Sequence, residues 1–180
     1  MGTKAWYVIP ECYIDTNLVE FLLHSNGVNH QKGCNAVATT MDRKLKEDFA
    51  IGVIDDDKRK HSYYNNFEEI ARSEHIRLMK HAQRPHYFIV ITPAMDQFIL
   101  DCANKAGINP EDFNLPTNLE DFKQVTKHIN VKDDNRIRNL FQAIGESQEI
   151  SILKNLLNYL NEKQYLANSV EMKALFEAEN

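Results

Sequence analysis

Three runs of apolar, β-prone residues punctuate the chain, at residues 6–9, 49–54 and 87–91. The run at 49–54 contains no polar side chain, and uninterrupted runs of this kind are typical of strands that are covered on both faces. Acidic or turn-forming residues follow each run within a few positions. The pattern therefore predicts three buried strands of an α/β sheet.

Between and after these strands, apolar residues recur at helical spacing. Helices are predicted over four segments, residues 15–25, 35–47, 67–77 and 92–106. In the last of these, Thr92 is expected to cap the helix and Pro93 to occupy its first turn. The pattern also allows a short strand near residues 76–79. Because parallel strands need a crossover connection, the alternation predicts a mainly parallel, Rossmann-like sheet flanked by helices.

The chain changes character after Pro116. Three helical patterns follow, at residues 119–128, 135–144 and 147–161. The last of them carries an apolar stripe from Ile150 to Leu160. We therefore divide the chain into an α/β domain, residues 1–115, and a helical appendage packed on it, residues 116–180. The stripe suits a dimer interface as well as an intramolecular core, so a homo-oligomer stays an alternative.

The composition narrows the class of protein. Hydrophobic residues make up 43% of the chain and charged residues 26%, which is ordinary for a globular protein. No apolar run approaches the roughly 20 residues that a membrane span needs, and the N-terminus lacks a signal-peptide pattern. The three cysteines form no C-x-x-C pair, so we expect a protein of the reducing cytoplasm.

Each predicted strand is followed by acidic residues at or just beyond its C-terminal end. These are Glu11 after the first strand, Asp55 and Asp57 after the second, and Asp96 after the third. Ligands of open parallel sheets bind outside the carboxyl ends of the strands, so the topology is expected to bring these acids together. Asp15 joins them if the first helix begins at Glu11, because residues four apart share a helix face.

A cluster of carboxylates predicts a metal site. Clustered carboxylates repel one another, and their pKa values rise when no cation is present. Mg²⁺ relieves this repulsion, since it favours carboxylate and water oxygens as ligands. Two such ions roughly 4 Å apart would stabilise both the attacking and the leaving oxygen of a phosphodiester. We therefore expect a two-metal Mg²⁺ site, with Mn²⁺ as a substitute.

The order of these motifs resembles that of Toprim domains. The segment from Glu11 to Asp15, after an apolar strand, resembles the Toprim glutamate element. The segment from Asp55 to Asp57, after the next core strand, resembles the Asp-x-Asp element. Residues 91–96 resemble the strand–Pro–acid element of small OLD-type Toprim nucleases. The chain departs from the pattern in having a cysteine where a glycine often follows the glutamate, and an aspartate where the last element usually has a glutamate.

The Toprim resemblance covers residues 4–108 and implies Mg²⁺-dependent breakage or joining of a nucleic-acid backbone. It assigns the first metal to Glu11, Asp55 and Asp57, and the second to Asp15 and Asp96. Glu11 would also accept a proton, and Lys58 would offset the charge that develops on the phosphate. Small Toprim proteins often act in defence, including antiviral defence, or in repair, together with an ATPase. The sequence has no Walker A motif, so that ATPase would be another chain.

A basic segment lies next to these acids. Between Lys58 and His86 there are seven Lys or Arg residues and three Glu, a local net charge of +4 against −9 for the rest of the chain. The candidate nucleic-acid contacts are Lys58, Arg59, Lys60, Arg77, Lys80 and Arg84. Such a segment could guide DNA or RNA towards the metals, although a solvated helix face explains it as well.

Two other interpretations stay open. The segment from Tyr13 to Asn17 resembles the opening motif of PIN-like nucleases, which would make Asp15 the primary ligand and Glu11 incidental. The chain could also be a catalytically inactive module that keeps the fold and binds a partner through its helical tail. The variants Glu11→Gln and Asp15→Asn separate the two nuclease interpretations, because each of these predicts a different variant to be the more damaging.

Overall fold

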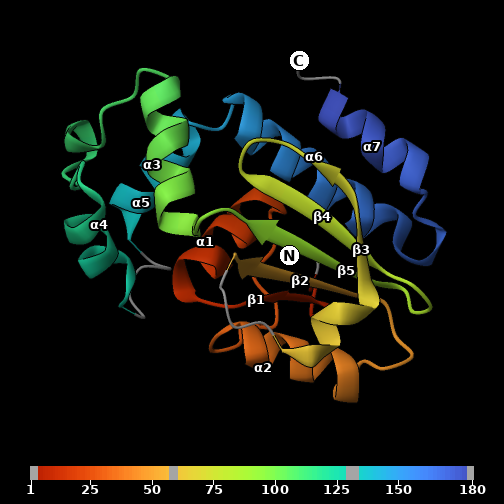
Figure 1. Cartoon of the computed structure of the whole chain (residues 1–180). Coiled ribbons are helices and arrows are strands. Elements are labelled where there is room, and N and C mark those ends of the chain that lie inside the picture. The colour runs from red at the N-terminus through yellow and green to blue at the C-terminus, as the bar shows by residue number, and fades with distance from the viewer. Residues whose placement is uncertain (1–3, 57–60, 129–133, 178–180) are drawn as a thin grey trace.

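A five-stranded sheet forms the centre of the molecule (Figure 1). The computed structural model describes residues 4–56, 61–128 and 134–177. Its strands are β1 (Val8–Pro10), β2 (Ala50–Asp55), β3 (Phe67–Arg72), β4 (Ile76–His81) and β5 (His86–Ile91). They lie in the order β1-β2-β5-β4-β3, so the three strands predicted from apolar runs are neighbours in the sheet.

The sheet is mixed, and the expectation of a mainly parallel sheet is wrong. β1, β2 and β5 are parallel, with Ile51 paired to Val8 on one side and to Tyr87 on the other. β4 is antiparallel to β5, and β3 is antiparallel to β4. The short turn at residues 73–75 joins β3 and β4 as a hairpin, and hairpin partners need no crossover helix. The α/β class is confirmed, but the parallel pairing is limited to three strands.

The helix predicted at residues 67–77 is wrong, because this segment forms β3, the turn and the start of β4. Its Glu, Ala and Arg residues favour a helix, but intrinsic propensity is weak where strand pairing competes. Phe67 pairs with His81 across the hairpin. β3 is an edge strand, where exposed charges such as that of Glu68 discourage pairing with other chains. The short strand expected near residues 76–79 is confirmed as β4.

Two apolar clusters cover the two faces of the sheet. Alternate residues of β2 point to opposite faces, so Ile51 belongs to the larger cluster and Ile54 to the smaller. The larger cluster includes residues of α1 (Tyr13–Leu22), α3 (Met95–Lys105) and α6 (Gln148–Lys163). The smaller includes residues of α2 (Cys34–Thr39) and of the π-helical turn η1 (Thr40–Lys44). Figure 1 shows α2 on one side of the sheet and α6 on the other.

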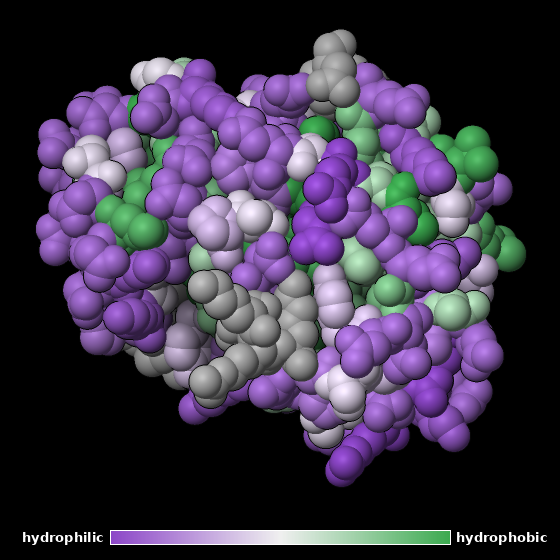
Figure 2. Space-filling view, in the orientation of Figure 1, coloured by the Kyte–Doolittle hydropathy of each residue, from purple (hydrophilic) through white to green (hydrophobic). Residues whose placement is uncertain are grey.

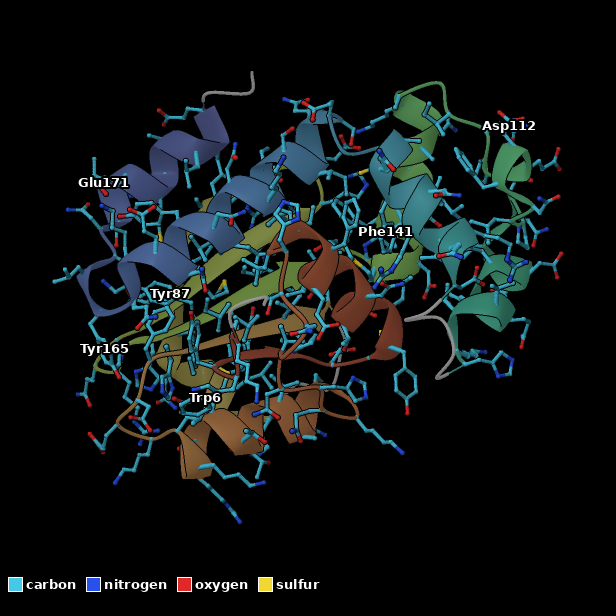
Figure 3. The ribbon with its side chains drawn as sticks, turned by 180° about the vertical axis from the view of Figure 1, so that it is seen from behind. Trp6, Tyr87, Asp112, Phe141, Tyr165 and Glu171 are labelled. Carbon is cyan, nitrogen blue, oxygen red and sulfur yellow. The ribbon has the colours of Figure 1, made fainter. Side chains whose placement is uncertain are left out.

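The helices of the second half of the chain pack on the larger cluster. They are α4 (Leu119–Thr126), α5 (Asn135–Ala143), α6 and α7 (Ser169–Glu177), joined in part by the 3-10 turns η3 (Pro110–Phe113) and η5 (Gln164–Leu166). The predicted apolar stripe of α6 is buried within the chain. Figure 3 shows Phe141 on α5. The centroid of its ring lies 5.7 Å from that of Phe21 in α1. The division at residue 115 stays a prediction, and side chains from both sides of it share one apolar cluster.

The surface of the face seen in Figure 1 is mostly hydrophilic (Figure 2). Among the described residues, the large hydrophobic side chains that are exposed are Trp6, Tyr165, Leu166 and Val170. No helix within the described ranges is long and apolar enough to cross a membrane.

Candidate metal centre

Asp15 lies in the first turn of α1 and is completely buried. Neither of its carboxyl oxygens has a hydrogen-bond partner of ordinary geometry among the described residues. Burial raises the pKa of this carboxyl well above its ordinary value, and the charges of Asp55 and Glu11 raise the pKa further, while the Cys12 thiol opposes part of the rise. An ionised carboxylate that is buried without hydrogen bonds lowers the stability of the folded chain, so Asp15 requires either a bound proton or a nearby cation.

Glu11 is held at the carboxyl end of β1 by its backbone. Its N–H donates to the carbonyl of Val53 at 3.1 Å, and its own carbonyl accepts from the N–H of Gly33 at 2.9 Å. The first bond continues the pairing with β2, and the second ties down the loop that follows α1. Gly33 has a φ of +87°, a conformation that favours glycine. The loop therefore returns to the end of β1 beside Glu11.

Asp55 ends β2 and caps α3. Its Oδ1 atom accepts a hydrogen bond from the backbone N–H of Met95 at 2.9 Å. The predicted helix start at Thr92 and Pro93 is therefore wrong. α3 begins at Met95, and the carboxylate that caps its first turn comes from the end of β2. The Thr92 hydroxyl instead donates to Asp56 at 3.3 Å.

Glu11, Asp15 and Asp55 form a triad, in which one carboxylate oxygen of each lies within 4.8 Å of the others. The three residues come from the end of β1, from α1 and from the end of β2. Two parallel strands and the helix between them therefore gather these acids at one edge of the sheet, as expected for an α/β fold. Three carboxylates at this separation provide the oxygen ligands that a hard divalent cation prefers.

Asp96 lies in the first turn of α3, as predicted, but does not belong to the triad. One of its oxygens accepts a hydrogen bond from the Thr126 hydroxyl at 2.5 Å. It lines the same pocket as Glu11 and Asp55. Within the described ranges, one group of three acids is close enough to share a metal ion, and a second ion at Asp96 stays a prediction.

Four of the predicted site residues, Asp57, Lys58, Arg59 and Lys60, lie outside the described residues. Asp56 precedes them and points to β4 rather than to the triad. Its Oδ2 atom lies 3.5 Å from Nη1 of Arg77 and accepts from Thr92. The alternation expected of an extended backbone is thus seen for Asp55 and Asp56.

A pocket of about 370 Å³ opens beside the triad. Two exposed lysines, Lys32 and Lys127, line it together with Glu11, Asp55 and Asp96. Lysine ammonium groups next to a candidate metal would attract an anionic substrate. Sequence reasoning missed both lysines.

Lys32 and Lys127 reach the pocket through the tertiary fold, and no sequence motif places them there. Lys32 reaches it because the loop after α1 runs back along β1, and the turn at Gly33 was its only local signal. Lys127 follows α4, in the predicted appendage, and nothing in its neighbourhood along the chain pointed to the acids. Thr126, the residue before it, was missed for the same reason.

An aromatic pair completes the rim of the pocket. The rings of Tyr13 and His30 stack with centroids 4.5 Å apart and an interplanar angle of 8°. The Thr16 hydroxyl donates to the carbonyl of Cys12 at 2.7 Å and lies 2.9 Å from Nδ1 of His30. Because a hydroxyl has one proton to donate, Nδ1 of His30 acts as the donor in this second bond. These contacts fix the orientation of the imidazole at the pocket.

The predicted nucleic-acid contacts that the structure describes lie on β4 and the turn after it. Arg77 pairs with Glu69 at 2.8 Å, and Arg84 pairs with Asp42 at 2.8 Å. Lys80 is half-buried on β4. Both arginines are therefore engaged with acids of their own chain, and a nucleic-acid role for the three residues stays a prediction.

Comparison with known proteins identifies no relative. No family model matches the chain, and neither a curated protein nor a solved structure matches it. The functional conclusion therefore depends on the chemistry of the triad and of the pocket beside it.

Proposed function

We propose that this chain binds Mg²⁺, with Mn²⁺ as a substitute, between Glu11, Asp15 and Asp55, and hydrolyses phosphodiester bonds of nucleic acid. The observation that carries the proposal is the state of Asp15, which is completely buried and lacks an ordinary hydrogen-bond partner among the described residues. Buried polar groups of proteins are nearly always bonded, and the exceptions need an explanation such as a bound ion. The nearness of two further carboxylates supports a cation over a proton.

The ligand set supports a hard cation. All three members of the triad are carboxylates, and oxygen ligands suit Mg²⁺ and Mn²⁺. Soft metals prefer thiolates, and in the metal-free chain burial raises the pKa of the Cys12 thiol. An all-carboxylate triad therefore favours Mg²⁺ or Mn²⁺ over a soft ion such as copper.

The residues around the triad support hydrolysis of a phosphate ester. A bound divalent ion supplies charge that offsets the negative charge developing on the phosphate, and it lowers the pKa of bound water. Glu11 is partly exposed at the pocket, unlike Asp15, and would accept a proton from the attacking water. Lys32 and Lys127 would bind the phosphate group of the substrate.

The nucleic-acid substrate and the setting of the reaction rest on the Toprim resemblance and on the basic segment at residues 58–86. The proposal includes an ATPase partner on another chain, in a defence or repair system. The purified chain is then expected to cleave DNA or RNA weakly by itself, because its partner would position the substrate. Robust metal-dependent cleavage by the chain alone would remove the need for such a partner.

Calorimetry with Mn²⁺ tests the metal site directly. The wild-type chain is expected to bind the ion, Asp55→Asn to lose binding, and the control Asp121→Asn, an exposed acid on α4 outside the pocket, to keep it. Failure of the wild-type chain to bind Mn²⁺, or equal binding by Asp55→Asn, would contradict the proposal and favour an inactive partner-binding module.

Cleavage of labelled single- and double-stranded DNA and RNA tests the substrate. Lys127→Ala is expected to raise KM about tenfold with a smaller effect on kcat, since a charged hydrogen bond to phosphate is lost. Lys173→Ala, which removes the same charge from α7, is the matched control. Equal KM values for the two variants would exclude Lys127 from substrate binding.

A further inference from the structure

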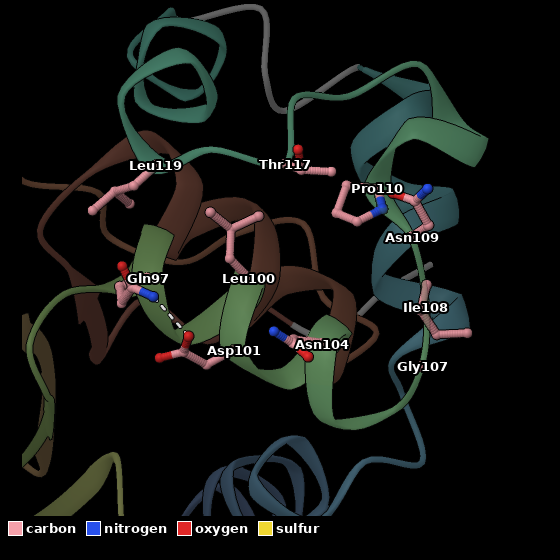
Figure 4. A pocket seen from close by; sticks show the side chains of 10 residues that line it. All are labelled: Gln97, Leu100, Asp101, Asn104, Gly107, Ile108, Asn109, Pro110, Thr117 and Leu119. Carbon is pink, nitrogen blue, oxygen red and sulfur yellow. Dashed lines mark hydrogen bonds between the residues drawn. The ribbon is translucent and has the colours of Figure 1, made fainter.

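A second pocket, of about 430 Å³, lies on the outer side of α3 (Figure 4). One wall is the helix itself, and the other is the segment of residues 107–119 that leads from α3 to α4. Figure 4 shows Gln97, Asp101 and Asn104 along the helix, facing Thr117 and Leu119 of this segment. The volume falls within the range of small-molecule sites. None of the three triad acids lines this pocket.

The segment that forms the second wall is built in a defined shape. Gly107, with a φ of +68°, ends α3, and the side chain of Asn109 accepts a hydrogen bond from the N–H of Glu111. Asn114 adopts the left-handed conformation that closes η3, and Leu115 is buried in the core. The pocket is therefore formed before a ligand arrives.

The lining of this pocket is polar, with a single charge. Its polar side chains are Gln97, Asp101, Asn104, Asn109 and Thr117. Leu100, Ile108 and Leu119 supply apolar surface between them. None of the described residues that line the pocket is Lys or Arg. A ligand with an anionic group would face Asp101 without a cation to bind it, so an anion is disfavoured.

Asp101 is held in a fixed orientation from within the protein. Nε2 of His75 lies 3.1 Å from its Oδ2 atom, and the amide of Gln97 donates to its Oδ1 atom at 2.6 Å. His75 is buried, and its Nδ1 atom lies 3.7 Å from Glu149, which is a buried acid. The Asp101 side chain nevertheless keeps 33% of its surface exposed. A carboxylate that is already oriented loses little freedom when a ligand binds.

The charges around this pocket are mostly negative. Glu111 and Asp112 lie on η3, and Glu120 and Asp121 lie in the first turn of α4. The neighbouring cations are paired as well: Lys105 with Glu74, Lys123 with Glu120, and Arg136, which donates to the carbonyl of Asn114, with Asp134. Surrounding acids raise the local concentration of a cationic ligand and disfavour a phosphate backbone.

We propose that this pocket binds a small organic cation, an aliphatic amine or guanidine, whose charged end pairs with Asp101. The alkyl part of the ligand lies against Leu100 and Leu119, and the amides of Asn104 and Asn109 bond its remaining polar groups. This site is independent of the metal triad and of the reaction proposed for it.

Calorimetry with four compounds that share a four-carbon chain tests the charge requirement. The probes are 1,4-diaminobutane, 1,4-butanediol and succinate, with agmatine as the guanidine. The two amines are expected to bind with a Kd of roughly 1 mM or tighter, and the diol and succinate at least about tenfold more weakly. Absence of amine binding, or equal binding of the diol, overturns the proposal.

Variants locate the binding. Asp101→Asn is expected to weaken binding of agmatine about tenfold or more, and Asp112→Asn, an exposed acid outside the lining, less than about twofold. Asp101→Asn also alters the contact with His75. A second pair of variants, at Asn104, therefore tests the same pocket without changing Asp101. Asn104→Lys places a positive charge at the exposed rim and abolishes binding, whereas Asn104→Gln retains it.

A metal-site variant separates this proposal from the proposed function. Asp15→Asn is expected to bind agmatine like the wild-type chain, whether or not the chain binds Mn²⁺. Loss of agmatine binding in Asp15→Asn, with retention in Asp101→Asn, would assign the amine to the triad and overturn the proposal.

Discussion

The Oδ1 atom of Asp55 accepts a hydrogen bond from the backbone N–H of Met95 at 2.9 Å, which joins the end of β2 to the first turn of α3. The same carboxylate belongs to the triad with Glu11 and Asp15. One side chain therefore holds a helix in place and contributes to the candidate metal centre. Its two roles can be separated by substitution, because an amide keeps the acceptor oxygen and loses the charge.

Asp55→Ala is expected to be less stable than Asp55→Asn by about 0.5–2 kcal/mol, since only the alanine variant loses the helix cap. Both variants lack the charge, so repulsion within the triad is equal in the two. Urea unfolding in metal-free buffer measures the difference. Equal free energies of unfolding would mean that the bond to Met95 does not stabilise α3.

Asp15→Asn is expected to stabilise the metal-free protein by about 1–2 kcal/mol, because the amide removes the cost of ionising or protonating a buried carboxyl and can donate to the neighbouring carboxylates. Since the pKa of Asp15 is raised in the folded state, the penalty is present at pH values above that pKa and disappears as the pH falls towards the ordinary value. The metal-free wild-type chain should therefore become more stable as the pH falls through this window. Addition of Mn²⁺ should stabilise the wild type and not the variant, and the reverse result would show that Asp15 is not a ligand.

Comparison of Glu11→Gln with Asp15→Asn distinguishes the two nuclease interpretations. A Toprim-type site predicts that Glu11→Gln is the more damaging and lowers kcat/KM by about 100-fold or more, since a proton acceptor is lost. A PIN-type site predicts that Asp15→Asn is the more damaging. The measurement is Mn²⁺-dependent cleavage of one nucleic-acid substrate, and a fold check by circular dichroism is required for both variants. Undiminished cleavage in both would remove the triad from the reaction.

We expect His86 to give the protein a pH dependence that is unrelated to the candidate metal centre. Its Nε2 atom lies 2.9 Å from the carbonyls of Leu45 and Asp48, and its Nδ1 atom lies 2.5 Å from the Tyr63 hydroxyl. Burial lowers the pKa of His86 from its ordinary value of 6.5, mainly by disfavouring the charged form. A lowered pKa means that stability is complete above 6.5 and is lost as the pH falls through the folded-state pKa.

The free energy of unfolding should therefore fall between about pH 7.5 and about pH 5.5, and His86→Gln should reduce this dependence. The pKa of His81 is lowered as well, by burial and by Arg84, so part of the dependence is expected to persist in the variant. Urea unfolding at several pH values measures the effect. A variant that keeps the full slope would assign the pH dependence to other groups.

The strands that the sequence predicted firmly are those with uninterrupted apolar runs, whereas β4 was expected only as an allowed short strand. β2 and β5 are covered on both faces, and such strands have no polar positions that could be mistaken for a helix face. β3 was missed because it is an edge strand with Glu68 and Glu69 exposed, and its composition is that of a surface helix. Pairing with β4 overrides this propensity, and a local pattern does not show which strands will pair.

The acids of the candidate site could be predicted because each follows a strand or opens a helix at the same edge of the sheet. Predicting that Glu11 and Asp55 lie close together required only that β1 and β2 be adjacent and parallel. Lys127 and Thr126 could not be predicted, since they reach the pocket only through the packing of α4 against α3. Contacts between distant parts of the chain depend on tertiary packing, which spacing within a motif does not encode.

The packing of α6 against α1 and α3 decides how the protein can be shortened. A chain that stopped at residue 115 would lose Leu153, Leu156 and Leu157 of α6, which share the larger apolar cluster with Leu18, Leu22 and Phe98, and would expose part of that cluster to water. It would also lose Thr126, which holds Asp96, and Lys127 from the pocket. Such a fragment should aggregate on expression, and it would be a poor reagent for testing the proposed metal binding and cleavage.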